Sequence, residues 1–367
     1  MCVGFQESAA GKSRRFGSKF NIVATLVVSF MNFWEKLPTP FFVLAPMADV
    51  TDASFRRMIA KYSAHTRADG TTGGPDVMWT EFVAADGLMR ATPEGKAKLL
   101  ADLIFAEEER PIVAQLFSSN PEYMEAAARL CKELGFDGID INMGCPDQSI
   151  EKQGCGAAMI KNPANARAII QAAKRGAGDL PISVKTRVGY NQEEIDTWIP
   201  ELLKEDIAAL TIHARTRKEM SKVPAKWEYV SRVVALRNKL APSVCIIGNG
   251  DVESLADAQE KVATFGPDGI MLGRSIFANP WLFHPEKDLS TVSLEERLTV
   301  MVEHTALFAT LLPHKNFAIM KKHYKAYVNG FPGAAELRHK LMEQNSPEDI
   351  KQVVHAFLSN PHENPVD

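Results

Sequence analysis

The sequence predicts an α/β fold, a (β/α)8 TIM barrel followed by a small all-helical C-terminal domain. Three observations support this prediction. Short apolar segments alternate with helical patterns eight times between residues 41 and 280, which is the repeat of such a barrel. The pattern G-x-G-x-x-G, expected after the first strand of the competing doubly wound sheet, does not follow the first apolar segment. Beyond residue 288 only helical patterns remain.

The predicted strands are apolar segments rich in β-branched residues. Between most of them, apolar residues recur every three to four positions, as in 121–135, which has proline at its start and glycine at its end. We therefore expect residues 36–288 to form the barrel. The strands are expected at 41–47 (FFVLAPM), 77–83 (VMWTEFV), 112–117 (IVAQLF), 138–144 (GIDINMG), 181–187 (PISVKTR), 210–216 (LTIHART), 245–251 (CIIGNGD) and 269–275 (GIMLGRS).

Helical patterns fill the predicted C-terminal domain, 289–367. Ser293 and Ser346 precede the first and the last of these patterns and are suitable helix caps. The patterns cover 293–312, 315–330, 331–345 and 346–358.

This C-terminal segment carries a local excess of positive charge. From His314 to Lys340, six lysines and arginines stand against one acidic residue, a net charge of +5 on a chain whose total is −3. Two interpretations stay open, a solvated helix face or a surface that contacts the phosphates of a nucleic acid. Under the second interpretation, Lys321, Lys322 and Arg338 are candidate contacts.

Residues 1–35 are predicted to be an extension with little structure. Four basic residues precede an apolar run, 22–34, in the manner of a targeting segment. The run is short for a membrane span, and no A-x-A cleavage pattern follows it. A targeting segment remains the alternative, and no membrane partner is expected.

The composition is that of a globular protein, with 46% hydrophobic and 24% charged residues. A net charge of −3 does not indicate a nucleic-acid or membrane partner for the chain as a whole, so any such surface must be local. The five cysteines are scattered and form no C-x-x-C pair. This pattern indicates a reducing, cytoplasmic compartment, and it argues against a disulfide framework and against a metal site.

Polar or small residues follow the predicted strands at their C-terminal ends. In a barrel these ends converge on one rim, where active sites lie. Lys185 and Arg187 are two positions apart on one strand and therefore share a face. His213 and Arg215 are related in the same way. The strand-end residues are Pro46, Met47, Glu81, Gln115, Asn142, Lys185, Arg187, His213, Arg215, Asn249, Asp251, Gly273 and Arg274.

The last two strand ends, G-N-G-D and L-G-R-S, indicate a phosphate site. Their glycines let backbone N–H groups approach an anion, and Arg274 supplies a positive charge. The chain has no Walker pattern, so the phosphate is expected to belong to a cofactor or substrate that is held in place rather than transferred. Lys185 is able to face a polar heterocycle. The amide of Gln115 offers both hydrogen-bond donors and an acceptor, which suits the edge of a flavin or pyrimidine, where donors and acceptors alternate.

Cys145 lies in the segment N-M-G-C-P, after the fourth predicted strand. At the rim of a barrel a thiol is placed for acid–base or nucleophilic chemistry. Taken alone, a single cysteine in an intracellular protein is more often a packing residue. Both interpretations stay open on the residues alone.

Several segments in this order resemble the tRNA-dihydrouridine synthases. They are LAPMADVTDASFRRM, AQLF, DINMGCP, GCGAAMIKNP, VKTRVGY, HART, GNGD and MLGRSIFANPWLF, and the similarity resumes at FPGAAELRHKL in the tail. The resemblance implies an enzyme that uses FMN, with NADPH as hydride donor, to reduce the C5=C6 bond of particular uridines in tRNA. It implies no obligate protein partner.

The resemblance also implies roles for individual residues. Cys145 would donate a proton to C5 after hydride reaches C6. Asn142, Arg187 and Arg215 would contact the substrate at the rim, and Lys321, Lys322 and Arg338 would contact the tRNA from the tail. The cofactor-binding residues would be Pro46, Met47, Ala48, Gln115, Lys185, His213, Asn249, Gly250, Asp251, Gly273 and Arg274.

The chain departs from the family pattern in the segment 216–227, which lacks the glycine that usually lies between H-x-R and the next tryptophan. Two other functions share part of this pattern. One is an FMN barrel that acts on a free pyrimidine, like a dihydroorotate dehydrogenase, which leaves the basic tail without a role. The other is a catalytically silent RNA-binding barrel, against which Cys145, Lys185 and the phosphate segments argue.

Overall fold

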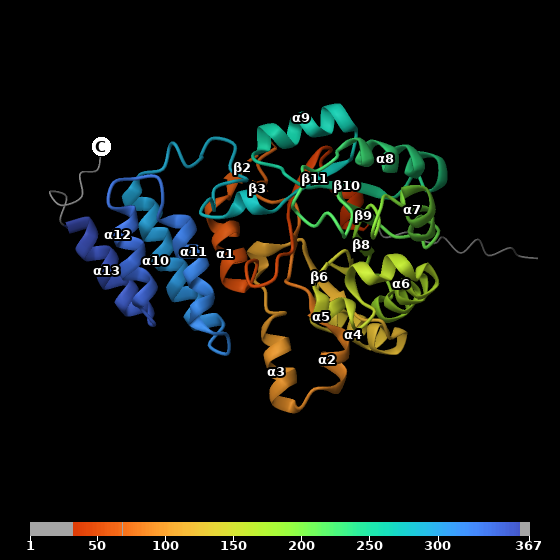
Figure 1. The fold of residues 1–367 in the computed structure, drawn as a ribbon, viewed down its shortest axis with the longest axis horizontal. Helices are drawn as coiled ribbons and strands as arrows, with labels where there is room; N and C mark the ends of the chain where they lie inside the picture. Colours follow the sequence, from red (N-terminus) through yellow and green to blue (C-terminus); the bar gives the residue numbers. More distant parts are fainter. Residues whose placement is uncertain (1–31, 68, 360–367) are drawn as a thin grey trace, which may run out of the picture. The chain divides into compact units, whose positions relative to one another are not determined.

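The computed structural model describes residues 32–67 and 69–359 (Figure 1). Of the predicted extension 1–35, residues 1–31 lie outside this part of the chain, so both interpretations of its apolar run stay predictions. The described remainder begins with a 3-10 helix, η1 (Phe33–Lys36). Trp34 in η1 is 4% exposed, and its ring lies 5.9 Å from that of Trp79 in the barrel.

Eight parallel strands form a nearly closed barrel, which confirms the predicted fold class. Each strand pairs in parallel with its neighbours in the order β1-β11-β10-β9-β8-β7-β6-β4. Hydrogen bonds from Leu44 N to Val77 O (3.2 Å) and from Asp76 N to Phe42 O (2.8 Å) bring the two end strands together. The strands are β1 (Phe41–Leu44), β4 (Met78–Trp79), β6 (Ile112–Phe117), β7 (Gly138–Met143), β8 (Ile182–Arg187), β9 (Ala209–His213), β10 (Cys245–Asn249) and β11 (Gly269–Leu272).

Three short strands lie outside this ring. β5 (Val83–Ala84) pairs with the end of β6, and β2 (His65–Thr66) forms an antiparallel hairpin with β3 (Thr72–Gly73). All eight predicted strands are therefore present, although several end one to four residues earlier than predicted. The trimmed residues, among them Met47, Arg215 and Asp251, belong to the loops at the rim.

Helices connect the strands and cover the outside of the barrel (Figure 1). The helix predicted at 121–135 is typical: Asn120 caps it by accepting from Glu122 N and Tyr123 N, and Gly135 follows it with φ of +84°. The helices are α1 (Ala53–Tyr62), α2 (Ala85–Arg90), α3 (Pro93–Ala101), α4 (Pro121–Glu133), α5 (Gln148–Glu151), α6 (Pro163–Ala177), α7 (Ile195–Leu203), α8 (Glu228–Leu240) and α9 (Leu255–Phe265), with 3-10 turns η2 (Glu107–Glu109), η3 (Gly156–Lys161) and η4 (Arg274–Ile276).

The four helical patterns of the C-terminal segment are confirmed. Ser293 and Ser346 cap the first and last helices as predicted, since their Oγ atoms accept from Glu296 N and Asp349 N. The helices are α10 (Leu294–Leu311), α11 (Met320–Tyr327), α12 (Ala334–Glu343) and α13 (Pro347–Ser359), with the 3-10 turn η5 (Phe317–Ile319) before α11.

These helices share one apolar core with part of the barrel. The core includes Leu298 of α10, Tyr324 of α11 and Leu337 of α12, together with Met58 of α1 and Trp281 from the segment after η4. The domain boundary at residue 288 stays a prediction. Among the described residues, no helix combines the length and the apolar character that a membrane span requires.

Candidate active site

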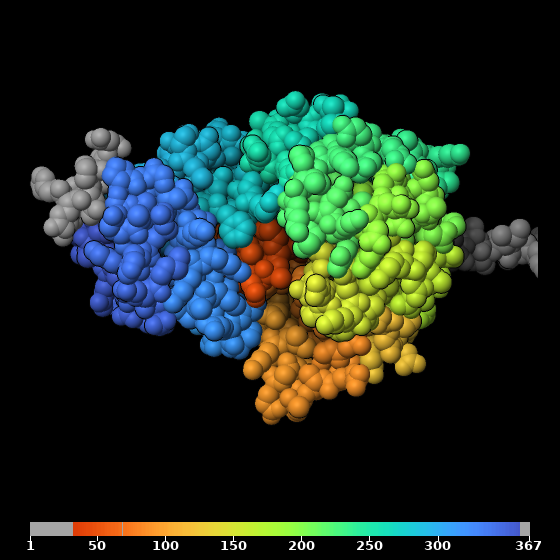
Figure 2. All heavy atoms as spheres, in the orientation of Figure 1, coloured from red at the N-terminus to blue at the C-terminus, as the bar shows by residue number. Residues whose placement is uncertain are grey.

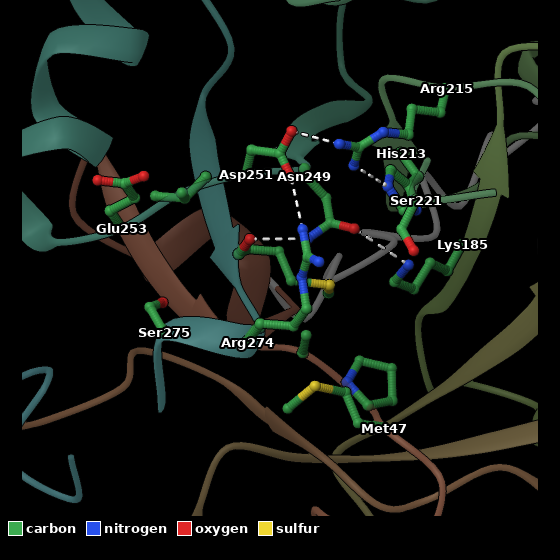
Figure 3. A pocket seen from close by; sticks show the side chains of 16 residues that line it. Met47, Lys185, His213, Arg215, Ser221, Asn249, Asp251, Glu253, Arg274 and Ser275 are labelled. Atoms are coloured by element: carbon green, nitrogen blue, oxygen red, sulfur yellow. Dashed lines mark hydrogen bonds and ion pairs between the residues drawn. The ribbon is translucent and has the colours of Figure 1, made fainter. Parts of the chain in front are cut away.

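A cavity of about 620 Å³ lies at the rim formed by the C-terminal ends of the strands (Figure 3). Figure 2 shows this face of the molecule hollowed where early residues of the barrel, in red, are visible between later segments. Residues of β8, β9, β10 and β11 and of the loops after β1, β9, β10 and β11 supply its walls. The lining residues are Ala45, Pro46, Met47, Lys185, His213, Arg215, Ser221, Asn249, Gly250, Asp251, Val252, Glu253, Met271, Gly273, Arg274 and Ser275.

The cavity brings together nine of the eleven residues predicted to bind a cofactor. Only Ala48 and Gln115 of that set do not line it. Of the residues predicted to contact substrate, Arg215 lines it, whereas Asn142 and Arg187 lie in the adjoining part of the rim. The barrel therefore gathers residues from five separate segments, as the strand-end pattern predicted.

One corner of the cavity is built around Asp251, which has φ of +48° and follows Gly250, with φ of +127°. Its carboxylate accepts hydrogen bonds from Arg274 Nη2 (2.6 Å), from Ala225 N (2.9 Å) and from Arg215. Burial alone would raise the pKa of Asp251, but the Ala225 N–H and the cations Arg215 and Arg274 hold it below its usual value. The carboxylate therefore stays ionised and orients both arginines.

Ser275 is a cavity residue that the sequence analysis did not single out. Its Oγ is buried and has no hydrogen-bond partner among the described residues. It lies directly after Arg274, in the segment L-G-R-S already connected with a phosphate. The motif thus contained the signal, because serine hydroxyls beside glycine and arginine are common anion ligands. Ser221 and Glu253 also line the cavity and were not predicted.

His213 and Arg215 share a face at the end of β9, as expected from their spacing. Arg215 Nη1 lies 3.3 Å from His213 Nε2. Burial and the charges of Arg187, Lys185 and Arg215 hold the pKa of His213 well below its usual value. The imidazole is therefore neutral, and since Nε2 accepts from Arg215, its proton lies on Nδ1.

Lys185 points into the cavity, where its Nζ donates to Asn249 Oδ1 at 3.3 Å (Figure 3). Asn249 is itself oriented by a bond from its Nδ2 to Met271 O (2.8 Å). Burial and the nearby charge of Arg187 lower the pKa of Lys185 to about 8. At neutral pH the ammonium group is still charged, and it is available to an electronegative group in the cavity.

Gln115 lies beneath the rim and not in the cavity wall. It is fully buried, its Nε2 donates to Asp140 Oδ2 (2.6 Å) and its Oε1 accepts from Asn142 Nδ2 (3.1 Å). Asn142 in turn accepts from the backbone N–H groups of Gly144 and Cys145. A continuous chain of hydrogen bonds therefore runs from the Cys145 loop to Asp140, a residue that the sequence analysis left among the apolar positions of its strand.

Cys145 lies on the same rim but does not line the cavity. It follows β7, and in that strand Asn142 is directly paired with Lys185 of β8. The thiol is partly buried, beside an apolar cluster that includes Phe117 and Ile150. Burial raises the pKa of the Cys145 thiol, against the opposing charges of Lys185 and Arg187. The thiol therefore carries its proton at neutral pH.

Arg187 and Arg215 are buried, with 6% and 3% exposure. Arg187 donates to the carbonyl oxygens of Gly144 (2.9 Å), Thr216 (3.1 Å) and Met220 (2.9 Å). Arg215 Nε donates to Val223 O (2.6 Å). Both arginines thus hold the segment 216–227, the one without glycine, against the rim. Substrate contact by Arg187 and Arg215 stays a prediction.

The basic residues of the tail differ in their ion pairs and hydrogen bonds. Lys315 is engaged in ion pairs with Glu81 and Asp102, and Arg338 Nη1 donates to Val328 O (2.6 Å). Lys321 and Lys322 are both partly buried, burial lowers the pKa of Lys322, and neither lysine forms an ion pair within 32–67 and 69–359. The tail is therefore only in part a freely solvated charged face. The predicted RNA contacts Lys321, Lys322 and Arg338 lie on α11 and α12, outside the cavity wall.

No cluster of three metal-ligating side chains exists in the part of the chain that the structure describes. The described cysteines Cys131, Cys145, Cys155 and Cys245 are all free. Cys131 and Cys155 are buried, and burial raises the pKa of Cys155 to about 11.

Comparison with known proteins identifies relatives along most of the chain. A family model described as dihydrouridine synthase matches residues 43–361. The probable tRNA-dihydrouridine synthase 2 of Bacillus subtilis (strain 168) is 40% identical over 329 residues, 89% of this chain and 96% of the relative. The probable tRNA-dihydrouridine synthase of Staphylococcus aureus (strain MRSA252) is 40% identical over 330 residues, 89% of this chain and 95% of the relative. The matched region includes both the barrel and the four C-terminal helices.

Proposed function

Because the chain belongs to the dihydrouridine synthase family, we propose that it reduces the C5=C6 bond of particular uridines in tRNA, with FMN as cofactor and NADPH as hydride donor. The observation that carries this proposal is the rim itself. A charged lysine, a neutral histidine and an arginine-bound aspartate face one cavity, and the loop of a protonated cysteine adjoins it.

The residues of the cavity fit a flavin mononucleotide. A volume of about 620 Å³ is in the range of small-molecule sites. Arg274 suits a phosphate, as does the Oγ of Ser275, which lacks a hydrogen-bond partner in the described part of the chain. The same corner presents the backbone of Gly250 and Gly273. The side chains of Met47 and Met271 suit an apolar ring system, while Lys185 and Asn249 suit its polar edge.

A flavin bound in this cavity would supply the hydride that C6 of the uracil accepts. Cys145 holds a proton at Sγ, and we assign it the transfer of that proton to C5. A raised pKa keeps this thiol protonated until negative charge develops on the base. Lys185 and Arg187 lie close enough to influence the thiol, and their charges favour negative charge on the base during the transfer.

A uridine folded into tRNA must leave its stack to reach this rim. Extraction costs a few kcal/mol, which stacking and pocket contacts offset. Binding to the phosphates of the tRNA is assigned to Lys321, Lys322 and Arg338 of the tail. An FMN barrel for free pyrimidines gives no reason for these helices, and the family model matches the chain through them.

The full chain tests this proposal directly. Purified protein should be yellow, and mass spectrometry of the released cofactor should identify FMN. Dihydrouridine mapped across tRNA from cells with and without the gene should disappear at defined positions and return when the wild-type gene is restored. A colourless protein that takes up no added FMN, or unchanged tRNA, contradicts the proposal.

A further inference from the structure

Lys315 lies between α10 and α11, yet its side chain reaches the rim of the barrel. Its Nζ lies 2.5 Å from Oε2 of Glu81 and 3.1 Å from Oδ1 of Asp102. Glu81 follows β4, and Asp102 ends α3. The side chains of Lys315 and Glu81 are only 11% and 8% exposed. One ammonium group thus connects the C-terminal helices to two segments of the barrel in a place that is screened from water.

Glu81 also holds the loop between β1 and α1. Its second oxygen, Oε1, accepts the backbone N–H of Asp49. Asp49 has φ of +52°, in the left-handed region that residues other than glycine seldom adopt. The turn is completed by Thr51, whose Oγ1 accepts from Met47 N at 2.8 Å. A backbone conformation of this kind is unfavourable by itself and persists only when contacts with surrounding residues stabilise it.

The same loop forms part of the cavity wall through Pro46 and Met47. A line of contacts therefore leads from Lys315 to Glu81, to Asp49 and then to Met47. Burial raises the pKa of Glu81, and the charge of Lys315 opposes this effect. Without Lys315 the carboxylate would lose its cation in a buried place, so it would take up a proton or move towards water, and either change loosens its bond to Asp49.

We propose that Lys315 is a positioning residue of the active site, which fixes Glu81 and thereby holds the loop 46–51 in the conformation that shapes the cavity. The C-terminal helices then have a second role besides contact with RNA, because one of their connecting segments maintains the site of the barrel. The expected effect on the affinity for FMN rests on the proposed function, whereas the expected effect on the conformation of the loop 46–51 does not.

The chain contains a matched control. Lys61 of α1 pairs with Glu303 of α10 at 2.6 Å, so this ion pair also joins the barrel to the C-terminal helices. Neither residue contacts the loop 46–51 in the described hydrogen bonds and ion pairs. Lys61→Met therefore removes a lysine from another ion pair between these parts, one that is more exposed (58% and 36%), without touching the proposed line of contacts.

The experiment is amide hydrogen exchange on the full chain without added cofactor, followed by titration with FMN. In Lys315→Met, peptides covering 46–52 should exchange roughly tenfold faster or more, the size expected when a buried charged contact is lost. Lys61→Met should leave these peptides unchanged, and Lys315→Arg should restore much of the protection. Affinity for FMN should fall in Lys315→Met and not in Lys61→Met.

If Lys315→Met does not fold, Lys315→Gln, which also removes the cation beside Glu81 but keeps a polar side chain, gives the same readout. Unchanged exchange in 46–52, or an equal increase in Lys61→Met, overturns the inference. If even the wild-type chain binds no FMN, the proposed cofactor is wrong, but the exchange data still decide whether Lys315 holds the loop.

Discussion

The Nε of Arg187 donates a hydrogen bond to the carbonyl oxygen of Gly144 at 2.9 Å, directly before the proposed proton donor Cys145. The same guanidinium bonds the carbonyl oxygens of Thr216 and Met220. The Cys145 loop and the segment 216–227, which borders the cavity at Ser221, are thus fixed to one another. Arginine suits this task because its planar group presents five N–H donors at once.

Arg187→Lys should lower dihydrouridine formation about a hundredfold, because an ammonium group cannot hold three carbonyl oxygens in this geometry and a displaced thiol is inefficient. FMN affinity should change little, since Arg187 does not line the cavity. Activity on tRNA and FMN titration measure the two effects. Arg129→Lys, at an exposed ion pair of α4, is the control and should behave as wild type. Full activity of Arg187→Lys would show that the Cys145 loop does not need the hydrogen bonds from Arg187 to hold its position.

Cys145→Ala should abolish product while FMN remains bound, because the thiol is assigned only to proton donation. Removing a positioned general acid lowers rates by about a hundredfold to ten-thousandfold. Cys155→Ala is the matched control, since Cys155 is a buried thiol of the same loop region whose pKa is raised to about 11. It should retain activity. Equal loss in both variants would point to packing and not to chemistry.

The rim could be predicted from the sequence because its residues follow from a local rule. A parallel strand is apolar along its length and polar at its end, so Lys185, His213 and Asn249 were found by position alone. Asp140 and Lys315 were missed as partners for a different reason. Asp140 lies inside the apolar β7, and Lys315 meets Glu81 across 234 positions of the chain. Such pairings depend on how distant segments pack, which no local pattern encodes.

Affinity for FMN should fall as pH rises through about 8. Burial and Arg187 lower the pKa of Lys185 to about 8 in the free protein, so above that pH the lysine loses the charge that attracts an electronegative group. The decrease should approach about tenfold per pH unit above the pKa. Lys185→Met should bind FMN more weakly and with no such dependence between about pH 7 and about pH 9.5. A wild-type affinity that stays constant over this range would contradict the prediction.

Affinity for tRNA should depend on salt through the tail. Lys321→Gln should weaken tRNA binding and reduce the slope of log K against log salt concentration by about one, the value for one lost phosphate contact. FMN binding should be unaffected, since Lys321 lies on α11, outside the cavity wall. Lys351→Gln on α13 is a control from the same group of helices. Filter binding at several salt concentrations measures both variants. A slope for Lys321→Gln identical to that of wild type would show that Lys321 does not contact the phosphates of the tRNA.

Asp140 should tolerate asparagine and not leucine. Its carboxylate accepts from Ser183 Oγ and Gln115 Nε2, both at 2.6 Å. An asparagine amide can still accept from Gln115 while it donates to Ser183, so Asp140→Asn should cost about 1 kcal/mol or less. Asp140→Leu leaves both buried groups unpaired and should cost about 3 kcal/mol. Urea unfolding of the two variants measures the difference, and equal losses would show that the hydrogen bonds contribute little.

A comparison of Asp140→Asn with wild type also tests the titration of Asp140. Burial raises the pKa of this carboxyl to about 6, although the hydrogen bonds from Ser183 and Gln115 oppose the shift. A carboxyl with a raised pKa binds its proton more tightly in the folded state than in the unfolded chain. Its stabilising contribution is therefore complete below about pH 4 and is lost as pH rises through about 6. Asparagine does not titrate, so the free energy of unfolding of Asp140→Asn relative to wild type should increase between about pH 4 and about pH 6.5. A difference that is constant with pH would mean that folding does not raise the pKa of Asp140.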